Sequence, residues 1–208
     1  MRDATPWAAG AATGIVPGLR GVRSSSSSRP AGPRAAAPRR ARSATAARAA
    51  LQVDVETRVR SWTPRRADIA AWASAALGRR AANAELSVRL VGRAEGRKLN
   101  ARYRGKDYAT NVLSFPAAGI VVPPAGASAR KGAAQPLGDL VICPPVLRAE
   151  ALEQRKTLRA HWAHLVVHGS LHLIGYDHER DADARRMERR EIAVLRRLGF
   201  MNPYLSTS

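Results

Sequence analysis

The sequence is short of cysteine, of aromatic residues and of long apolar runs. Cys143 is the single cysteine among 208 residues, so an internal disulfide framework and a cysteine-based zinc knuckle are both excluded. This cysteine usage is typical of an intracellular protein. Aromatic residues make up 5% of the chain, which limits any function built on stacked aromatic side chains. No apolar run approaches the roughly 20 residues of a membrane-spanning helix, so we expect a soluble protein with no membrane partner.

Acidic residues are also scarce relative to basic ones. The chain has 16 Asp and Glu against 35 Lys and Arg, which gives a formal net charge of +19 and a pI near 11.6. A field of this sign attracts polyanions, and their binding releases counterions. Nucleic acid or a ribonucleoprotein surface is therefore the first partner to consider.

The first 50 residues differ in composition from the rest. They hold nine Arg, no Lys, one acid (Asp3) and a run of five serines at 24–28. This composition is typical of an organellar transit peptide; the alternative is a disordered basic extension that binds RNA or has no role. The serine run favours a chloroplast, and the arginine density would also suit a mitochondrion. Without this segment the formal charge is still +11, so the remaining domain is itself basic.

From residue 51 the pattern is that of a globular domain. Alternating apolar residues predict strands, and apolar residues at helical spacing predict helices. Thr63 is expected to cap the first helix with Pro64 at its first position, Gly78 to end it, and Gly199 to end the last helix. The expected strands cover 52–59, 85–91, 110–115 and 137–143, and the expected helices cover 64–77, 95–103, 146–174 (with a break left open) and 181–198. Residues 117–136 look like a long surface loop. Interleaved strands and helices indicate an α/β or α+β domain with one small sheet.

All five histidines lie between residues 161 and 178. His168 and His172 are four residues apart and therefore share one face of a helix. Gly175 is expected to end that helix and to allow the sharp turn that brings His178 back as a third ligand. Histidines at positions zero, four and ten with a glycine at seven have the spacing of the metzincin peptidases. The sequence therefore predicts one zinc ion on these three histidines with an open fourth position.

One residue departs from the peptidase pattern. Where those enzymes have a glutamate directly after the first histidine, this chain has Gly169. That glutamate is the general base that takes a proton from the zinc-bound water. Peptide hydrolysis by that route is therefore not expected.

The other polar residues of this region leave alternatives open. His161 and His164 are expected to serve packing, although His164 lies one turn before His168 and suits a role behind the ligands. Asp177 either orients an imidazole or caps the helix expected near Glu179.

The histidine segment, His168-Gly-Ser-Leu-His172-Leu-Ile-Gly-Tyr-Asp-His178, resembles the signature of the YbeY family, rRNA maturation factors described as single-strand-specific endoribonucleases. Three further segments agree with family motifs in order and spacing: Leu99-Asn-Ala-Arg-Tyr-Arg104-Gly-Lys106-Asp107, Thr110-Asn-Val-Leu-Ser114-Phe-Pro116 and Leu137-Gly-Asp139-Leu-Val-Ile-Cys143. The resemblance covers about residues 52–200. Residues 1–50 lie outside it, and 117–136 are longer than the bacterial loop.

The resemblance implies an α+β (αβα) fold, in which a small mixed four-stranded sheet is packed with helices and one helix carries the metal ligands as in zincins. The domain would span residues 51–202, with His168, His172 and His178 on one zinc ion. The resemblance also implies that Arg104 is functionally important. It further implies single-stranded RNA, and rRNA in particular, as substrate, the small ribosomal subunit as partner, and an organellar form of a bacterial rRNA factor. The oligomeric state is left open.

The expected chemistry is hydrolytic cleavage of single-stranded RNA. The Arg104 guanidinium, which binds phosphate bidentately, would neutralise charge on the transition state beside the zinc ion. Lys106, Ser114 and Asp139 are candidate substrate-binding residues. No general base is obvious, and Asp139 and Asp177 are the candidates.

A basic stretch near the C-terminus also has two interpretations. Its side chains either hold the RNA backbone or form ion pairs with Glu188 and Glu191 on a solvated helix face. These arginines are Arg185, Arg186, Arg189 and Arg190.

Three functions therefore compete. The first is a zinc-dependent endoribonuclease that acts in rRNA maturation and ribosome quality control. The second is a ribosome-assembly factor whose zinc is structural and whose cleavage activity is weak or absent. The third is a zinc peptidase, which Gly169 disfavours.

Overall fold

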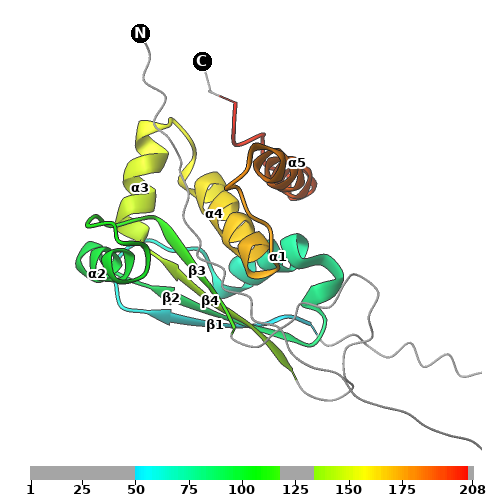
Figure 1. Cartoon of the computed structure of the whole chain (residues 1–208), viewed down its shortest axis with the longest axis horizontal. Coiled ribbons are helices and arrows are strands. Elements are labelled where there is room, and N and C mark those ends of the chain that lie inside the picture. The colour runs from blue at the N-terminus through cyan, green and yellow to red at the C-terminus, as the bar shows by residue number, and fades with distance from the viewer. Residues whose placement is uncertain (1–49, 118–133, 206–208) are drawn as a thin grey trace, which may run out of the picture. The chain divides into compact units, whose positions relative to one another are not determined.

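A computed structural model describes residues 50–117 and 134–205 of the chain (Figure 1). The predicted transit peptide at 1–50 falls outside the described residues except for its last position, and so does most of the predicted loop at 117–136. Within the described residues, no helix has both the length and the apolar composition needed to cross a membrane.

The core of the fold is one mixed sheet of four strands in the order β1-β2-β4-β3. The strands are β1 (Gln52–Thr57), β2 (Ala84–Leu90), β3 (Val112–Pro116) and β4 (Gln135–Ile142). β1 pairs parallel to β2 and β2 parallel to β4, whereas β3 runs antiparallel to β4. In β2, buried and exposed residues alternate along the whole strand, as expected where one face is covered and the other is solvated. The predicted small mixed four-stranded sheet is confirmed.

A bulge in β4 lets a proline lie within a central strand. The register with β2 shifts between Glu85 and Leu86, which pair with Pro136 and Gly138, so that Leu137 is the extra residue. Gly138 has a φ of +128°, and a Cβ there would lie 2.1 Å from the carbonyl oxygen of Phe115. Only glycine therefore fits this position beside β3.

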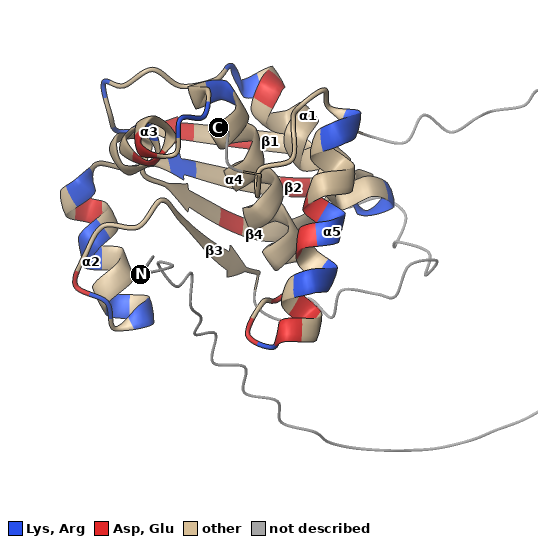
Figure 2. Ribbon diagram, turned by 90° about the horizontal axis from the view of Figure 1, so that it is seen from above, with Lys and Arg blue, Asp and Glu red and all other residues tan. Residues whose placement is uncertain are grey.

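Helices pack on both sides of this mixed sheet, so the predicted α+β fold with αβα layers is confirmed. α1 (Arg66–Leu77) and α4 (Leu158–Leu173) lie on one face, and α5 (Asp181–Arg197) packs against the outside of α4 (Figures 1 and 2). α2 (Arg93–Arg104) contacts the opposite face near β3, where the Tyr103 ring lies 4.9 Å from the Phe115 ring. α3 (Pro144–Glu153) packs beside α4.

α4 is the central helix of the fold. Residues on all of its sides are buried, from Trp162, which is fully buried, to Leu173. The main hydrophobic core, formed with α1, α5 and the sheet, surrounds it. A helix with this burial is held by the whole fold rather than by a single neighbour.

The long helix predicted at 146–174 is two helices. Arg155 adopts a φ of +51°, and the backbone N–H of Lys156 donates to the carbonyl of Ala151, which ends α3 in a Schellman-like turn. Thr157 then caps α4, because its hydroxyl accepts a hydrogen bond of 3.2 Å from the backbone N–H of Ala160.

Most of the other boundaries differ from the sequence prediction by one or two residues, and two of these differences have a structural reason. The first helix was expected at Pro64 behind a Thr63 cap, but α1 begins at Arg66 with Arg65 at its N-cap position. Pro64 is instead buried against the rest of the protein. β4 begins two residues earlier than expected, because the bulge accommodates Pro136.

Candidate metal centre

Two of the three predicted histidine ligands lie on the last two turns of α4. His168 and His172 share one face of the helix, and their Nε2 atoms are 3.1 Å apart. Gly175, at a φ of +87°, follows the helix, and its backbone N–H donates to the carbonyl of His172. This turn brings His178 to the other two rings, with ring centroids 5.6 Å from His168 and 4.9 Å from His172. The structure therefore brings together the three histidines that the spacing predicted.

The donor set fits a zinc ion. One ring nitrogen from each of His168, His172 and His178 lies within 4.8 Å of the other two. Zinc–nitrogen bonds of about 2.0 Å place neighbouring ligands of a tetrahedral site about 3.3 Å apart, close to the observed 3.1 Å between the two Nε2 atoms. Imidazole nitrogens are ligands that zinc prefers. We call these three residues the triad.

The surroundings of His168 and His172 favour the neutral form of both imidazole rings. Burial, together with the nearby His168, His178 and Arg104, lowers the pKa of His172 to about 3, although Asp177 opposes this shift. Burial also lowers the pKa of His168, although its bond to Glu191 opposes this. Both imidazoles are therefore neutral at physiological pH, which is the form that binds a metal.

Gly169 is the point at which α4 touches the sheet. A Cβ at this position would lie 2.8 Å from Leu140 Cδ2 and 3.2 Å from Ser114 Oγ, closer than ordinary van der Waals contact. The Ser114 hydroxyl donates to the carbonyl of Gly169 over 3.3 Å. The glutamate of the zinc peptidases therefore has no room here, which gives a physical reason for its absence.

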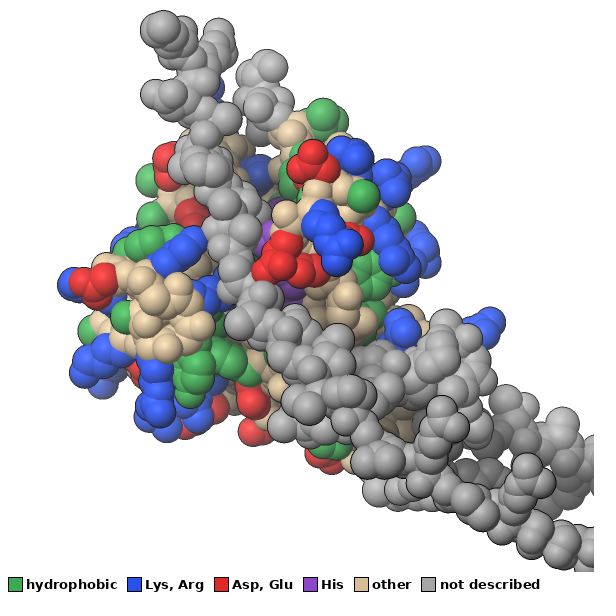
Figure 3. Space-filling model, viewed as in Figure 1, with side chains coloured by type: hydrophobic (Ala, Val, Ile, Leu, Met, Phe, Trp, Pro, Cys, Tyr) green, Lys and Arg blue, Asp and Glu red, His purple; other side chains and the backbone are tan. Residues whose placement is uncertain are grey.

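Arg104 lies on the triad's side of the molecule. It is the last residue of α2, it is exposed, and its charge contributes to lowering the pKa of His172. Lys106 follows in the turn after α2 and is half-buried. Figure 3 shows histidine side chains at the surface between the parts of the molecule formed by α2 and α5, with basic side chains on both of these parts. The structure thus brings Arg104 within electrostatic range of a histidine ligand.

Asp139 lies on the opposite face of the sheet from the triad. It pairs in register with Ser87 and Phe115, whereas its neighbour Leu140 points to Gly169 of α4. With Tyr103 and Phe115 it lines a separate hollow of about 410 Å³. The structure does not bring Asp139 to the histidines.

Asp177 does not cap the last helix. α5 begins at Asp181 with Arg180 at its N-cap position, and the Asp177 carboxylate instead accepts a bond of 2.7 Å from the backbone N–H of His178. Its negative charge opposes the lowering of the pKa of His172. The cap interpretation was therefore wrong, and the residue acts on the third ligand's backbone.

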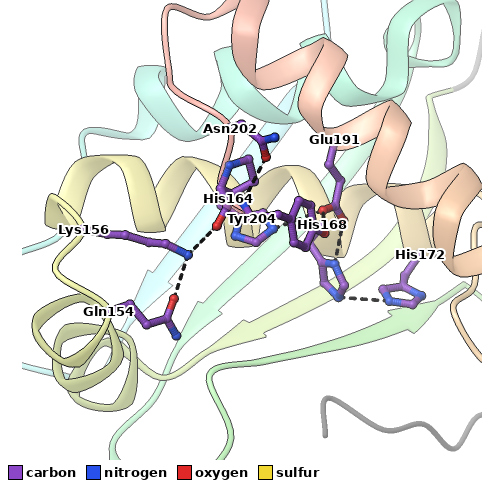
Figure 4. A network of polar contacts seen from close by, with 9 residues as sticks. Gln154, Lys156, His164, His168, His172, Glu191, Asn202 and Tyr204 are labelled. Carbon is purple, nitrogen blue, oxygen red and sulfur yellow. Dashed lines mark hydrogen bonds and ion pairs between the residues drawn. The ribbon is translucent and has the colours of Figure 1, made fainter. Parts of the chain in front are cut away.

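Sequence reasoning missed the residue behind the triad, Glu191. One of the two interpretations of the basic stretch made it a surface partner of the arginines on α5, but its side chain is fully buried. Its carboxylate lies 2.7 Å from His168 Nδ1 and 3.1 Å from His164 Nε2, and it accepts a short bond from the Tyr204 hydroxyl (Figure 4). Burial would raise the pKa of Glu191, but the hydrogen bonds from His164 and His168 lower it on balance, so the residue is a carboxylate.

A signal for Glu191 was present in the sequence. The buried positions of α5 are Met187, Glu191, Val194 and Leu195, which form one stripe at helical spacing. A glutamate within an apolar stripe is a buried acid, and such an acid needs a partner. Four arginines of this helix were candidates either to hold RNA or to pair with acids. Of these, Arg186 lies over the Tyr176 ring, and Arg190 donates to the carbonyl of Ala76 over 3.4 Å.

A second carboxylate, that of Glu150, pairs with the ring of His161. Its Nε2 lies 2.9 Å from Glu150, which also accepts from the side-chain amide of Asn111. His161 and His164 line a cavity of about 640 Å³ that reaches His168 and His178. His161 is buried, as the packing expectation requires, and it also pairs with an acid, whereas His164 has the role behind the ligands that the sequence left open.

The family model named Endoribonuclease YbeY matches residues 52–199. The chain belongs to the YbeY family. A protein named Endoribonuclease YbeY from Pseudomonas putida (strain W619) is 51% identical over 154 residues, covering 74% of this chain and 93% of the relative. Another with that name, from Stutzerimonas stutzeri (strain A1501), is 49% identical over 158 residues, covering 76% and 94%. The YbeY resemblance predicted from the four motifs is thus confirmed.

A solved structure gives a weaker match. The solution structure of TM1509 from Thermotoga maritima matches with a TM-score of 0.45 and 22% identity, covering 69% of this chain and 87% of the other.

Proposed function

We propose that this YbeY-family chain is a zinc-dependent endoribonuclease that cleaves single-stranded RNA during rRNA maturation and ribosome quality control. The observation that carries the proposal is the approach of three ring nitrogens to within 4.8 Å of one another, with the charge of Arg104 acting on one of these rings. The relatives that are 51% and 49% identical to this chain are both named Endoribonuclease YbeY, which supports the same activity.

Each residue of the site has a proposed role that follows from its position. His168, His172 and His178 would hold the metal. When bound, zinc supplies Lewis acidity toward a phosphoryl oxygen or a water molecule. The Arg104 guanidinium is permanently charged and binds the phosphate, so that it offsets the charge that develops as the P–O bond breaks. Lys106 would hold the RNA backbone next to this position, and Ser114 links β3 to the helix that carries the ligands.

The basic surface supports a polyanionic substrate. Lys and Arg residues occur along the ribbons of both α2 and α5, the two helices beside the triad (Figure 2). Their field attracts RNA without reading its sequence, and its effect falls as salt increases. Binding of RNA by this surface should therefore weaken steeply between low and physiological salt.

A matched pair of variants tests the proposal. Arg104→Ala should lower the rate of cleavage of a single-stranded RNA by about 10²–10³-fold, the usual effect of losing one transition-state contact, with zinc content unchanged. Arg102→Ala, which removes the same charge two residues earlier on α2, should stay within a few-fold of the wild type. His172→Ala should lose zinc and cleavage together. Full cleavage by Arg104→Ala, or cleavage by a metal-free His172→Ala, would refute this mechanism.

A ribosome-assembly factor with a structural zinc is the second candidate. It is favoured by the engagement of Glu191, because three donors already occupy the one buried carboxylate beside the triad among the described residues. Single-turnover cleavage of an rRNA precursor, with and without chelator, separates the two. No zinc-dependent cleavage together with retained binding to the small ribosomal subunit would favour the assembly factor. The zinc peptidase remains disfavoured, because Gly169 has no room for the required glutamate.

We further propose that residues 1–50 direct the protein to a chloroplast, with the mitochondrion as the alternative destination. The support is the arginine-rich, serine-rich and acid-poor composition of this segment. A fluorescent protein fused behind residues 1–60 should enter one of these organelles. A diffuse cytosolic signal would refute the targeting role.

A further inference from the structure

Glu191 joins three parts of the fold behind the triad. The carboxylate lies on α5, His164 and His168 lie on α4, and Tyr204 belongs to the segment that follows α5 (Figure 4). Its Oε1 faces His168 Nδ1 at 2.7 Å, and its Oε2 faces His164 Nε2 at 3.1 Å and the Tyr204 hydroxyl. The side chain of Glu191 is fully buried, so these three contacts replace its hydration.

We infer that Glu191 is a positioning residue: it accepts a hydrogen bond from Nδ1–H of His168 and so fixes that ring in the tautomer whose Nε2 lone pair faces His172. The inference rests on the proposed metal site at the triad. An imidazole with its proton on Nδ1 presents an unprotonated Nε2, the form that ligates a metal. Without Glu191, the proton would be free to move to Nε2 and block the ligand position.

The same residues form a competing arrangement. His164, His168 and Glu191 also have three ligand atoms within 4.8 Å of one another. The separation of 2.7 Å between His168 Nδ1 and the carboxylate is a hydrogen-bond length, well below the ligand separation of about 3.3 Å at a tetrahedral zinc ion. Because Nδ1 cannot both donate a proton and bind a metal, occupation of one site excludes the other.

The position of Glu191 also separates it from a general base. Glu191 contacts Nδ1 of His168, whereas Nε2 of the same ring faces His172. The His168 ring therefore separates the carboxylate from the position where the three ring nitrogens would hold a metal. Three donors occupy its oxygens. Glu191 therefore acts through His168 rather than on the substrate.

The donors around Glu191 predict opposite tautomers for two neighbouring histidines. A carboxylate only accepts, so His168 must donate from Nδ1 and His164 from Nε2. The Nδ1 atom of His164 is buried and has no hydrogen-bond partner among the described residues, which agrees with an unprotonated nitrogen there. Tyr204, whose pKa is raised by burial and by Glu191, remains a phenol that donates.

Ring-nitrogen NMR of the full chain tests the inference without relying on activity. In the zinc-free protein at neutral pH, ¹⁵N spectra should show His168 protonated on Nδ1 and His164 protonated on Nε2. Zinc affinity, measured by competition with a chromophoric chelator, should fall by roughly 10–100-fold in Glu191→Gln, the usual effect of losing a carboxylate behind a metal-bound histidine. Glu188→Gln removes the same charge from an exposed position one turn earlier on α5 and should leave affinity within about twofold of the wild type.

The outcomes separate this inference from the proposed function. A wild-type His168 protonated on Nε2, or a folded Glu191→Gln variant with unchanged zinc affinity, overturns the positioning role and leaves zinc at the triad intact. A wild-type chain that shows the expected tautomers but binds no zinc overturns the proposed metal site instead. If circular dichroism shows that Glu191→Gln is unfolded, the wild-type tautomers decide alone.

Discussion

Replacing Gly169 by alanine should destabilise the fold, although alanine is the better helix former. The added Cβ would lie 2.8 Å from Leu140 Cδ2, and Leu140 is fully buried and has little space to move. The substitution gains about 0.5–1 kcal/mol in helix propensity. Overpacking of a tight core costs typically 1–3 kcal/mol. The free energy of unfolding should therefore fall by roughly 1 kcal/mol, the difference between the middle values of these two ranges.

Gly96 offers a matched control, because it is also a buried glycine inside a helix. A Cβ there would meet Cys143 at 3.6 Å and Val91 at 3.8 Å, which are ordinary contact distances. Gly96→Ala should therefore raise the free energy of unfolding by about 0.5–1 kcal/mol, since only the propensity gain remains.

Urea unfolding of the chelator-treated proteins measures both changes without a contribution from bound metal. The expected result is a change of opposite sign for the same substitution at the two positions. If Gly169→Ala were as stable as the wild type, or both variants changed in the same direction, the close approach of α4 to the sheet would not be what excludes a side chain at Gly169.

Three further predictions follow from the same structure. Thr157→Ala should lower the free energy of unfolding by about 1 kcal/mol through loss of the α4 cap, measurable by urea titration, and an unchanged midpoint would contradict the cap. The pKa of His172 is lowered, mainly by burial, from 6.5 to about 3, so below pH 6.5 the unfolded chain binds a proton that the folded chain does not. The free energy of unfolding of the zinc-free protein should therefore fall as the pH drops from about 6.5 toward 3, and the lowered pKa of Glu191 adds a further loss below 4.5. A free energy of unfolding that rises on acidification would refute both contributions. Zinc at 100 times its dissociation constant should stabilise the wild type by about 2.7 kcal/mol, seen as a higher Tm, and should leave the Tm of His172→Ala unchanged.

Much of the fold is local in origin and was therefore predictable. The alternation in β2 and the helical spacing in α5 are properties of neighbouring residues, and Gly78 and Gly199 follow their helices at positive φ as expected. The start of α1 was wrong because Pro64 is used for packing, which local preference does not reveal. The bulge in β4 depends on its pairing with β2, so the strand appeared to begin after Pro136.

The site also contains residues that local sequence predicts and residues that it does not. The triad could be predicted because two ligands lie one helical turn apart and the third follows a glycine turn. Glu191 contacts His168 across 23 residues and two helices, a contact that no local pattern encodes. Tyr204 lies after the last helix, where no periodicity indicates that its hydroxyl contacts the buried Glu191.

The burial of α4 on all sides has a consequence for how fast a metal ion enters and leaves. The backbone positions of His168 and His172 cannot shift without opening the hydrophobic core around α4, an event that approaches global unfolding. His178 lies instead in the segment between α4 and α5, outside both helices. We therefore expect metal exchange to follow opening of this short segment, and amide hydrogen exchange to be far slower along α4 than around His178.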